Sequence, residues 1–177
     1  MGSSHIDIKA RFFSKVRRWV NQLHRYDYSD PVGLLARSDE PVLGSREAGT
    51  LFDPCVLERE EGFVMFASSR RDGGLVRCVS KDGLAWSPPR LVFAPHSGSR
   101  SWNSLVNRAC VIERSGFWLM WFTGQDGCKS KIGVAKSTDG VHFEQVLSDA
   151  VLEAEHSYEG ISVMNPCVLW DDARKVY

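Results

Sequence analysis

The five cysteines have the widest chemical repertoire of any residue type in this chain, as nucleophiles, metal ligands or disulfide partners. Five is an odd number, so a complete set of intrachain disulfides is impossible. Zinc sites favour close pairs of the C-x-x-C type, and the sequence has none. Cys55, Cys110 and Cys167 instead lie 55 and 57 residues apart. We therefore expect one recurring buried position in a reducing compartment, and we predict no metal site and no cofactor.

Other residue arrangements that carry out catalysis are not recognised in this sequence. His96 and His142 have no partner at the spacing of a metal site or a catalytic triad, and no Ser-His-Asp order stands out. No Gly-rich phosphate-binding loop follows a strand into a helix. Aromatic side chains are more unusual, with nine Phe, six Trp and four Tyr among 177 residues. Rings in such number fit a dense β core or a surface that stacks on sugars, and core packing is the commoner use.

Composition limits the class of protein. A chain of 177 residues suits one domain, or at most two, and 43% apolar with 25% charged residues is the balance of a soluble globular protein. The 22 basic and 22 acidic residues cancel, so no nucleic-acid partner is expected. No apolar run approaches the roughly 18 residues that span a bilayer, and the N-terminus lacks the pattern of a secretory signal. We therefore expect a cytoplasmic protein without an integral membrane segment.

The spacing of the three cysteines is part of a longer internal repeat. Each cysteine stands in a similar tetrad, Pro-Cys-Val-Leu, Ala-Cys-Val-Ile or again Pro-Cys-Val-Leu. Alignment on the cysteines matches an apolar run at 62–68 with one at 116–123, and the pattern Ser-x-Asp-Gly-x-x-aromatic at 80–86 with 137–143. A short apolar run closes each unit, which makes four strand candidates separated by Gly- or Asp-rich turns. Four strands in about 40–55 residues are typical of a β-propeller blade, so we predict an all-β fold of four-stranded antiparallel blades.

The Ser-x-Asp-Gly turn has a clear structural purpose. Its Asp side chain bonds to the backbone of the turn, and its Gly adopts the positive φ that reverses the chain between the third and fourth strands. The aromatic residue that follows can then fold back onto the apolar face of the blade. We expect this turn to be structural and to bind no ligand.

The chain before the first blade differs from the rest. Residues 1–28 are basic, with apolar residues at three- and four-residue steps over 6–25, which predicts an amphipathic helix packed on its own domain or, less often, lying on an anionic membrane. Residues 29–48 contain several Pro and Gly and predict an irregular lead-in segment. The partial propeller then spans 49–177, with blades at about 49–100, 101–155 and 156–177. The third blade stops where its second strand should start, and a propeller needs at least four blades to close. We therefore expect the remainder of the propeller to be missing from this chain.

Three motifs, in this order, resemble those of a known group of enzymes. Phe52-Asp53-Pro54-Cys55-Val56 opens the first blade, the segment 80–86 lies near its end, and Tyr158-Glu159-Gly160 leads into Asn165-Pro166-Cys167-Val168. This combination is similar to the five-bladed β-propeller glycosidases of glycoside hydrolase families 32, 43, 62, 68 and 130. The resemblance runs from about residue 49 to the end and covers the first half of such a domain.

The resemblance implies roles for individual residues. Asp53 matches the carboxylate that acts as general base, or as nucleophile in retaining members, and Glu159 matches the region that supplies the general acid. The second blade of the family often provides an Asp that orients the acid and tunes its pKa, whereas this sequence has Asn107-Arg108 there. If Arg108 reaches the site, its charge can hold an anionic group of the substrate such as phosphate, which favours the phosphorylase-like members.

Side chains near these positions are candidate substrate contacts. Trp102 stands in the loop that leads into the second blade, where a ring can form a stacking platform for a sugar. Asn107 and Arg108 belong to the same group, and His156 lies close to the expected acid in the sequence. We predict a carbohydrate substrate for this set.

Glycoside cleavage requires one carboxylic acid to protonate the leaving oxygen and one carboxylate to activate water or attack the sugar, roughly 5 Å apart for retention and roughly 6.5–9.5 Å for inversion. We therefore predict a glycosidase or a glycoside phosphorylase that acts through Asp53 and Glu159, with Glu153 and Glu155 as competitors for the acid. A non-catalytic propeller that binds carbohydrate or protein is the main alternative, and Asp53 would then only brace a blade. A sialidase-like propeller is a weaker alternative, because its turn usually has an extra residue before the Gly.

Overall fold

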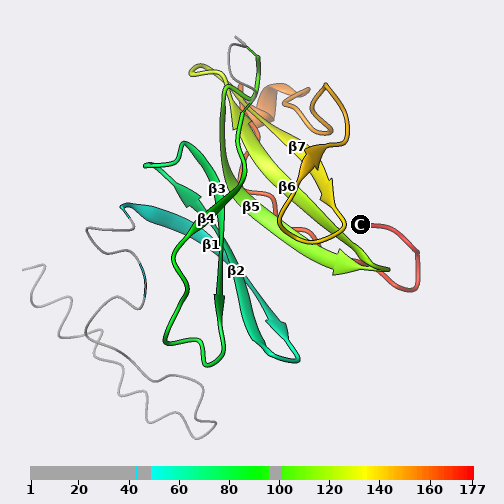
Figure 1. Ribbon diagram of the computed structural model, residues 1–177. Helices are drawn as coiled ribbons and strands as arrows, with labels where there is room; N and C mark the ends of the chain where they lie inside the picture. Colours follow the sequence, from blue (N-terminus) through cyan, green and yellow to red (C-terminus); the bar gives the residue numbers. More distant parts are fainter. Residues whose placement is uncertain (1–42, 44–48, 96–100) are drawn as a thin grey trace, which may run out of the picture. The chain divides into compact units, whose positions relative to one another are not determined.

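The computed structural model describes residues 43, 49–95 and 101–177 of the chain. They contain eight β-strands and one short 3₁₀ helix, and the strands form two four-stranded antiparallel sheets (Figure 1). The predicted all-β class and four-stranded antiparallel blades are therefore confirmed. The amphipathic helix expected over 6–25 lies outside the described residues, as does nearly all of the lead-in segment 29–48.

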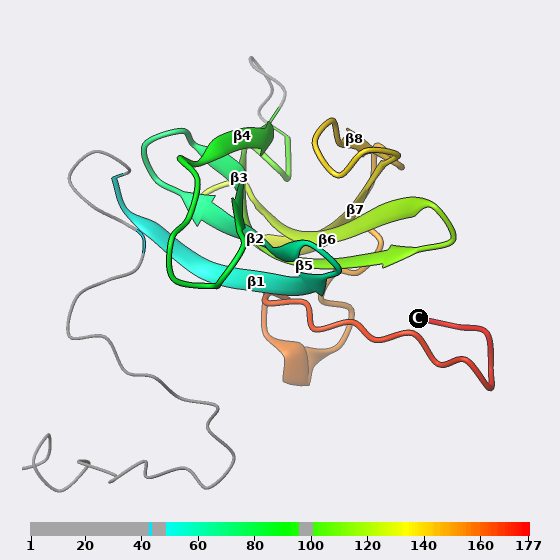
Figure 2. The ribbon, with the colours of Figure 1, turned by 60° about the horizontal axis from the view of Figure 1, so that its bottom comes forward.

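Each sequence repeat folds into one sheet in which consecutive strands are neighbours. The strands of the first sheet are β1 (Leu51–Arg59), β2 (Gly62–Ser69), β3 (Gly74–Ser80) and β4 (Arg90–Phe93). Those of the second sheet are β5 (Leu105–Arg114), β6 (Phe117–Gln125), β7 (Ser130–Ser137) and β8 (Glu144–Gln145). The two sheets are seen from another direction in Figure 2. Consecutive antiparallel strands joined by short turns form a meander, which is the topology of a propeller blade.

The third repeat does not form a strand in the described residues. It begins with the short helix η1 (Ser157–Glu159), and its one β-bridge joins Asp171 to Val176. We expected the first strand of a third blade here. A strand is stabilised by its ladder with a neighbour, and none of the described residues provides a ladder partner for 165–170. The segment still runs beside the second sheet, because the backbone N–H of Val168 donates to the thiol of Cys110 in β5 at 3.3 Å.

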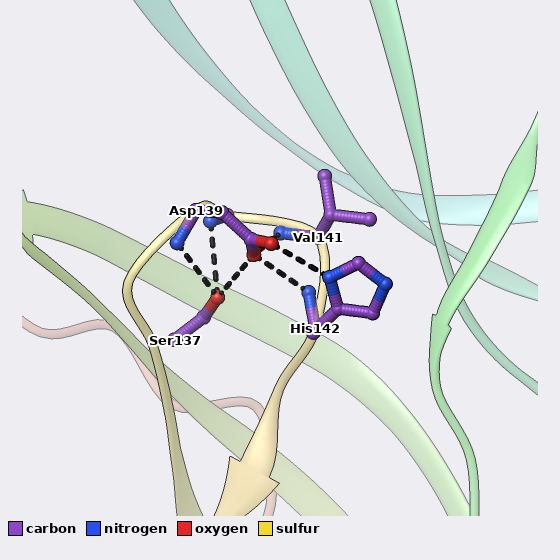
Figure 3. Close-up of polar contacts among 5 residues, drawn as sticks. Ser137, Asp139, Val141 and His142 are labelled. Carbon is purple, nitrogen blue, oxygen red and sulfur yellow. Dashed lines mark hydrogen bonds and ion pairs between the residues drawn. The ribbon is translucent and has the colours of Figure 1, made fainter.

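The Ser-x-Asp-Gly turn forms as the sequence predicts (Figure 3). Asp139 Oδ1 accepts the backbone N–H groups of Val141 and His142, both at 2.8 Å, and also the hydroxyl of Ser137. Gly140 has a φ of 69°, which closes the reversal. Hydrogen bonds to its carboxylate hold the pKa of Asp139 well below its usual range. Those from the backbone N–H and the ring of His142 contribute most. The turn is therefore stabilised from within.

The equivalent turn of the first sheet has the same bonds. Asp82 Oδ1 accepts the N–H groups of Leu84 and Ala85 at 2.8 Å, and Gly83 has a φ of 75°. The Trp86 ring folds back and donates its indole N–H to the carbonyl of Gly83 at 2.9 Å. Two segments 57 residues apart thus fold into the same turn, as local side-chain chemistry predicts.

Aromatic rings from both sheets form one core between them. Phe66 of β2 is fully buried and lies 5.9 Å from the Trp118 ring of β6 and 5.8 Å from that of Phe143, centroid to centroid. Phe93 of β4 meets Phe122 of β6 at 4.8 Å. Each large apolar side chain buried in this way contributes about 1.5–3 kcal/mol to folding. The sheets are therefore held face to face by ring packing, which is the use expected for most of the aromatic residues.

The repeat cysteines connect neighbouring units in register. Cys55 Sγ accepts the backbone N–H of Val111 at 3.3 Å, and Cys110 Sγ accepts that of Val168 at the same distance. Each thiol therefore bonds the residue that follows the next cysteine of the repeat. The expected recurring position is found, but the expected burial is wrong: Cys55 and Cys110 are half-buried and Cys167 is exposed. Within the described residues no further unit covers Cys167, which is why it stays open to solvent.

Candidate functional site

Three residues at the start of the three repeats share an unusual backbone. Asp53, Arg108 and Asn165 each stand two positions before a repeat cysteine and have φ values of 51°, 54° and 60°. The ladder with the next strand is interrupted at Asp53 and at Arg108, where the register shifts. A left-handed backbone at a residue other than glycine costs of order 1–3 kcal/mol, and such residues cluster at functional sites as well as in turns, as at Ser115. These three positions define the candidate site.

Arg108 and Asn165 are each hydrogen-bonded to the preceding repeat. The N–H of Arg108 donates to Ser68 Oγ in β2 at 2.9 Å, and the N–H of Asn165 donates to Thr123 Oγ1 in β6 at 3.1 Å. Both hydroxyls are almost fully buried. A bulge leaves its N–H without a ladder partner, and a buried N–H must find another acceptor. The hydroxyl of one blade thus positions the site residue of the next.

Asp53 and Arg108 face each other from neighbouring sheets. Arg108 Nε lies 3.4 Å from Asp53 Oδ2. The Arg108 side chain is 30% exposed and that of Asp53 is 43% exposed. The guanidinium also donates to Asn107 Oδ1 at 3.1 Å, and the amide of Asn107 donates to Gln125 Oε1 at 2.7 Å. The ion pair is too exposed to add much to stability. Its effect is to fix the direction of the Asp53 carboxylate.

Glu159 has a different setting. Its Oε2 accepts the backbone N–H groups of Glu155 and His156, both at 2.8 Å, so the carboxylate caps the short helix η1. The ring of His156 stacks on Tyr158 with 5.1 Å between centroids. No direct contact joins Asp53 to Glu159 in the described part of the chain. The acid role of Glu159 and the substrate contact of His156 therefore stay predictions.

Trp102 packs against the second sheet. Its ring stacks on Phe122 at 5.9 Å with 10° between planes, and its indole N–H donates to the carbonyl of Ser148 at 3.0 Å. A Cβ at Gly133 would lie 2.6 Å from this ring, and one at Gly124 would lie closer still. These contacts pack the ring closely against Phe122 and two glycines. A stacking platform for sugar on its other side stays a prediction.

The structure thus brings Asp53, Asn107 and Arg108 together, and it places Trp102 and the Glu159–His156 pair in separate contacts. Asn165 was not among the predicted site residues, although alignment on the repeat cysteines would have identified it. Ser68 and Thr123 had no sequence signal, because a serine or threonine in a strand is common.

Other kinds of site are absent from the part of the chain that the structure describes. No group of three or more His, Cys, Asp or Glu residues there is arranged to hold a metal ion. Nor does any helix in that part have the length and apolar character needed to cross a membrane. A hollow of about 1280 Å³ borders the hairpin between β1 and β2, and neither Asp53, Arg108, Asn165 nor Glu159 lines it.

Comparison with known proteins identifies the fold. No family model matches the chain. A thermostable family-43 glycoside hydrolase has a similar structure, with a TM-score of 0.56 and 19% identity over 70% of this chain and 38% of the other. An exo-1,5-α-L-arabinanase from a bovine ruminal metagenomic library matches with a TM-score of 0.53 and 16% identity over 70% of this chain and 44% of the other. The two sheets are therefore blades of the propeller fold found in these glycosidases.

One curated protein shares sequence with part of the chain. The uncharacterized protein MT1551 of Mycobacterium tuberculosis (strain CDC 1551 / Oshkosh) is 33% identical over 90 residues, which are 50% of this chain and 29% of that protein. The chain matches less than half the length of each of these three proteins.

Proposed function

We propose that this chain provides the first blades of an enzyme that cleaves glycosidic bonds, with its active site at the Asp53–Arg108 pair. The observation that carries the proposal is the 3.4 Å contact between two residues at equivalent bulges of neighbouring blades. Strained backbone at two partly exposed, oppositely charged residues that meet between adjacent blades supports a functional site there. The likeness to a family-43 hydrolase and an arabinanase supports a carbohydrate as the substrate.

In the proposed reaction Asp53 is the general base or the nucleophile. Arg108 binds one carboxylate oxygen, Oδ2, and so directs the other oxygen toward the substrate. Glu159 is the general acid that protonates the leaving oxygen, and its Oε2 is already fixed by two backbone N–H groups. Asn107 and His156 contact hydroxyl groups of the sugar, and Trp102 stacks on it.

Phosphorolysis is a variant of the same proposal. Arg108 carries several N–H donors, of which the structure pairs Nε with Asp53 and one terminal nitrogen with Asn107. A phosphate near the axis can use the remaining donors, because guanidinium binds such oxygens in pairs. The attacking group would then be phosphate in place of water.

A non-catalytic propeller that binds carbohydrate or protein is the second candidate. The observation that favours it is Arg108 itself, which stands where the glycosidases often have an acid-orienting Asp. In this case Asp53 and Arg108 brace neighbouring blades, and the rings and loops bind the ligand.

For the whole protein we propose further blades that continue from the open third repeat. We also propose a cytoplasmic location, since all five cysteines are free thiols.

Substitution of Asp53 tests the proposal. Asp53→Asn keeps the shape and one hydrogen-bonding oxygen but can neither accept a proton nor attack carbon. In the complete protein we expect a loss of about 10²–10⁴ in kcat/KM on an activated aryl glycoside, with an unchanged melting temperature. Glu61→Gln, in the exposed turn between β1 and β2, is the matched control and should retain full activity. Near-normal turnover in Asp53→Asn would refute the catalytic role and favour the binding module.

A further inference from the structure

Arg77 of β3 has a charged side chain that pairs with no described residue. The side chain is half-buried, and its Nε is buried without a hydrogen-bond partner. In the first sheet Arg77 lies opposite Phe66 of β2 and Arg90 of β4. Neither of these side chains has an oxygen or nitrogen that can accept its hydrogen bonds. A partly buried cation without an acceptor costs free energy, so its presence in a folded protein requires a reason.

The charged groups around Arg77 do not neutralise it. Burial and, after it, the charge of Arg90 lower the pKa of Arg77, whereas Asp139 raises it. The Asp139 carboxylate is bonded to the N–H groups of Val141 and His142 and forms its ion pair with the His142 ring (Figure 3). Within the described ranges no carboxylate forms an ion pair with Arg77. The acceptor that Arg77 lacks must therefore come from solvent or from a ligand.

Arg77 lines the hollow of about 1280 Å³ beside the β1–β2 hairpin, together with Phe63 of β2 and Trp118 of β6. Ligand pockets usually enclose about 300–1,000 Å³, so a small molecule has room here. Because Nε is buried, a polar group in the hollow meets the two terminal nitrogens of the guanidinium. These nitrogens provide parallel N–H donors, the geometry that binds two oxygens of a carboxylate or phosphate.

The other cations that line the hollow differ from Arg77. Arg59 forms an ion pair with Glu113, and its guanidinium lies over the Trp118 ring, 5.2 Å from the centroid. Lys81 is exposed to solvent directly after β3. Arg77 is thus half-buried, lines the hollow and has no carboxylate partner among the described residues.

Carboxylates that line the hollow restrict what Arg77 can bind. Glu58, Glu60 and Glu61 are exposed, at the end of β1 and in its turn into β2, and their charges repel a polyanion. Asp82 is bonded to the backbone of its own turn. Carboxylates also accept hydrogen bonds from hydroxyl groups. A ligand with several hydroxyl groups and a single acidic group therefore suits the whole set.

We propose that Arg77 binds the carboxylate or phosphate group of a small hydroxylated molecule in this hollow. The guanidinium donates two N–H bonds to the acidic group, and the exposed glutamates of the hairpin accept from the hydroxyl groups. The site is separate from the Asp53–Arg108 pair, since neither residue lines the hollow. The proposal requires no chemistry at Asp53 and does not depend on the proposed glycosidase activity.

Calorimetric titration of the full chain tests the choice of ligand. Glucuronate provides a carboxylate, glucose 6-phosphate provides a phosphate, and glucose is the neutral control. We expect heat of binding from at least one of the two acidic sugars and none from glucose at the same concentration. The tighter of the two identifies the acidic group that Arg77 prefers. Binding of neither acidic sugar, or equal binding of glucose, would overturn the proposal.

Arg77→Met tests the residue itself, because it removes the guanidinium and keeps an unbranched apolar stem. Since the Arg77 side chain bonds to no described residue, we expect the melting temperature without ligand to be at least that of wild type. Affinity for the acidic sugar should fall about tenfold or more. Arg90→Met is the matched control: it removes the neighbouring cation, which does not line the hollow, and should bind nearly as well as wild type.

Two further variants make the assignment specific. Arg77→Lys keeps the charge but loses the paired donors, so it should bind less tightly than wild type even if Arg77→Met does not fold. Arg108→Met should leave binding unchanged. Circular dichroism melts verify that each variant is folded. If Arg108→Met loses the sugar while the folded Arg77 variants bind it as wild type does, the acidic group binds at the blade starts and the assignment to Arg77 is wrong.

Discussion

Arg108 Nε lies 3.4 Å from Asp53 Oδ2, and both residues occupy the same bulge position in neighbouring sheets. The pairing arises because each bulge turns its residue away from its own ladder, which lets the side chains meet across the boundary between blades. Opposite charges at these two positions therefore couple the start of one blade to the start of the next. Substitutions at position 108 can distinguish the effect of this ion pair on stability from the effect of the strained backbone.

The first prediction concerns the left-handed backbone at position 108. Arg108→Gly removes the ion pair but also removes the penalty of a positive φ of 54°, so we expect stability within about 1 kcal/mol of wild type. Arg108→Val removes the same ion pair and places a β-branched side chain in that conformation. It should be less stable than Arg108→Gly by at least about 1 kcal/mol in urea unfolding. Equal stabilities for the two variants would show that the bulge relaxes.

A second prediction concerns the buried hydroxyl groups between blades. Ser68→Ala leaves the N–H of Arg108 without its acceptor, which should cost about 1–3 kcal/mol. Thr123→Val should behave alike, because it keeps the shape and removes the acceptor for the N–H of Asn165. The control is Thr138→Val, at an exposed position in the turn after β7, where we expect little change. If Thr138→Val destabilises the protein as much as Thr123→Val, the hydroxyl does not act through Asn165.

Close packing under Trp102 leads to a third prediction. A Cβ at Gly133 would lie 2.5 Å from the Phe122 ring and 2.6 Å from that of Trp102. Overpacking of this kind typically costs about 1–3 kcal/mol, so Gly133→Ala should lower the midpoint of thermal unfolding. In the double variant Gly133→Ala/Trp102→Leu the smaller side chain makes room for the methyl group. The effects should then be non-additive, whereas simple additivity would indicate that Trp102 does not limit the space at Gly133.

The fourth prediction is the pH dependence of the Ser-x-Asp-Gly turns. The pKa values of Asp82 and Asp139 are lowered in the folded state, the first by the N–H groups of Ala85 and Leu84 and the second chiefly by His142. A carboxyl with a lowered folded pKa stabilises the fold above its unfolded pKa, and that stabilisation is lost as the pH falls through the folded value. We therefore expect the melting temperature to decrease as the pH is lowered below about 4.

Replacement of both turn aspartates provides the check. Asp82→Asn/Asp139→Asn should melt lower than wild type at neutral pH and depend less on pH below about pH 4. Asp149→Asn, in the loop after β8, is the comparison for the loss of one exposed charge and should keep the acid dependence of wild type. A double variant that follows the wild-type pH curve would show that other carboxylates control acid unfolding.

The sequence by itself determined the features that arise within one repeat. The Ser-x-Asp-Gly turns are encoded within seven residues, since Asp139 bonds to the N–H groups two and three positions ahead and Gly140 adopts the required φ. The spacing of Cys55, Cys110 and Cys167 likewise indicated the repeating units. Such features depend on short-range bonding and on period, which a single sequence contains.

Only the tertiary structure decided which side chains meet between repeats. The Asp53–Arg108 contact joins residues 55 positions apart, and Ser68 reaches the N–H of Arg108 across 40 positions. The Trp102 ring packs closely on Gly124 and Gly133, whose lack of a side chain admits it, and no sequence pattern indicated this contact. These contacts depend on how two sheets pack against each other, and that arrangement is determined by the whole aromatic core rather than by any local pattern.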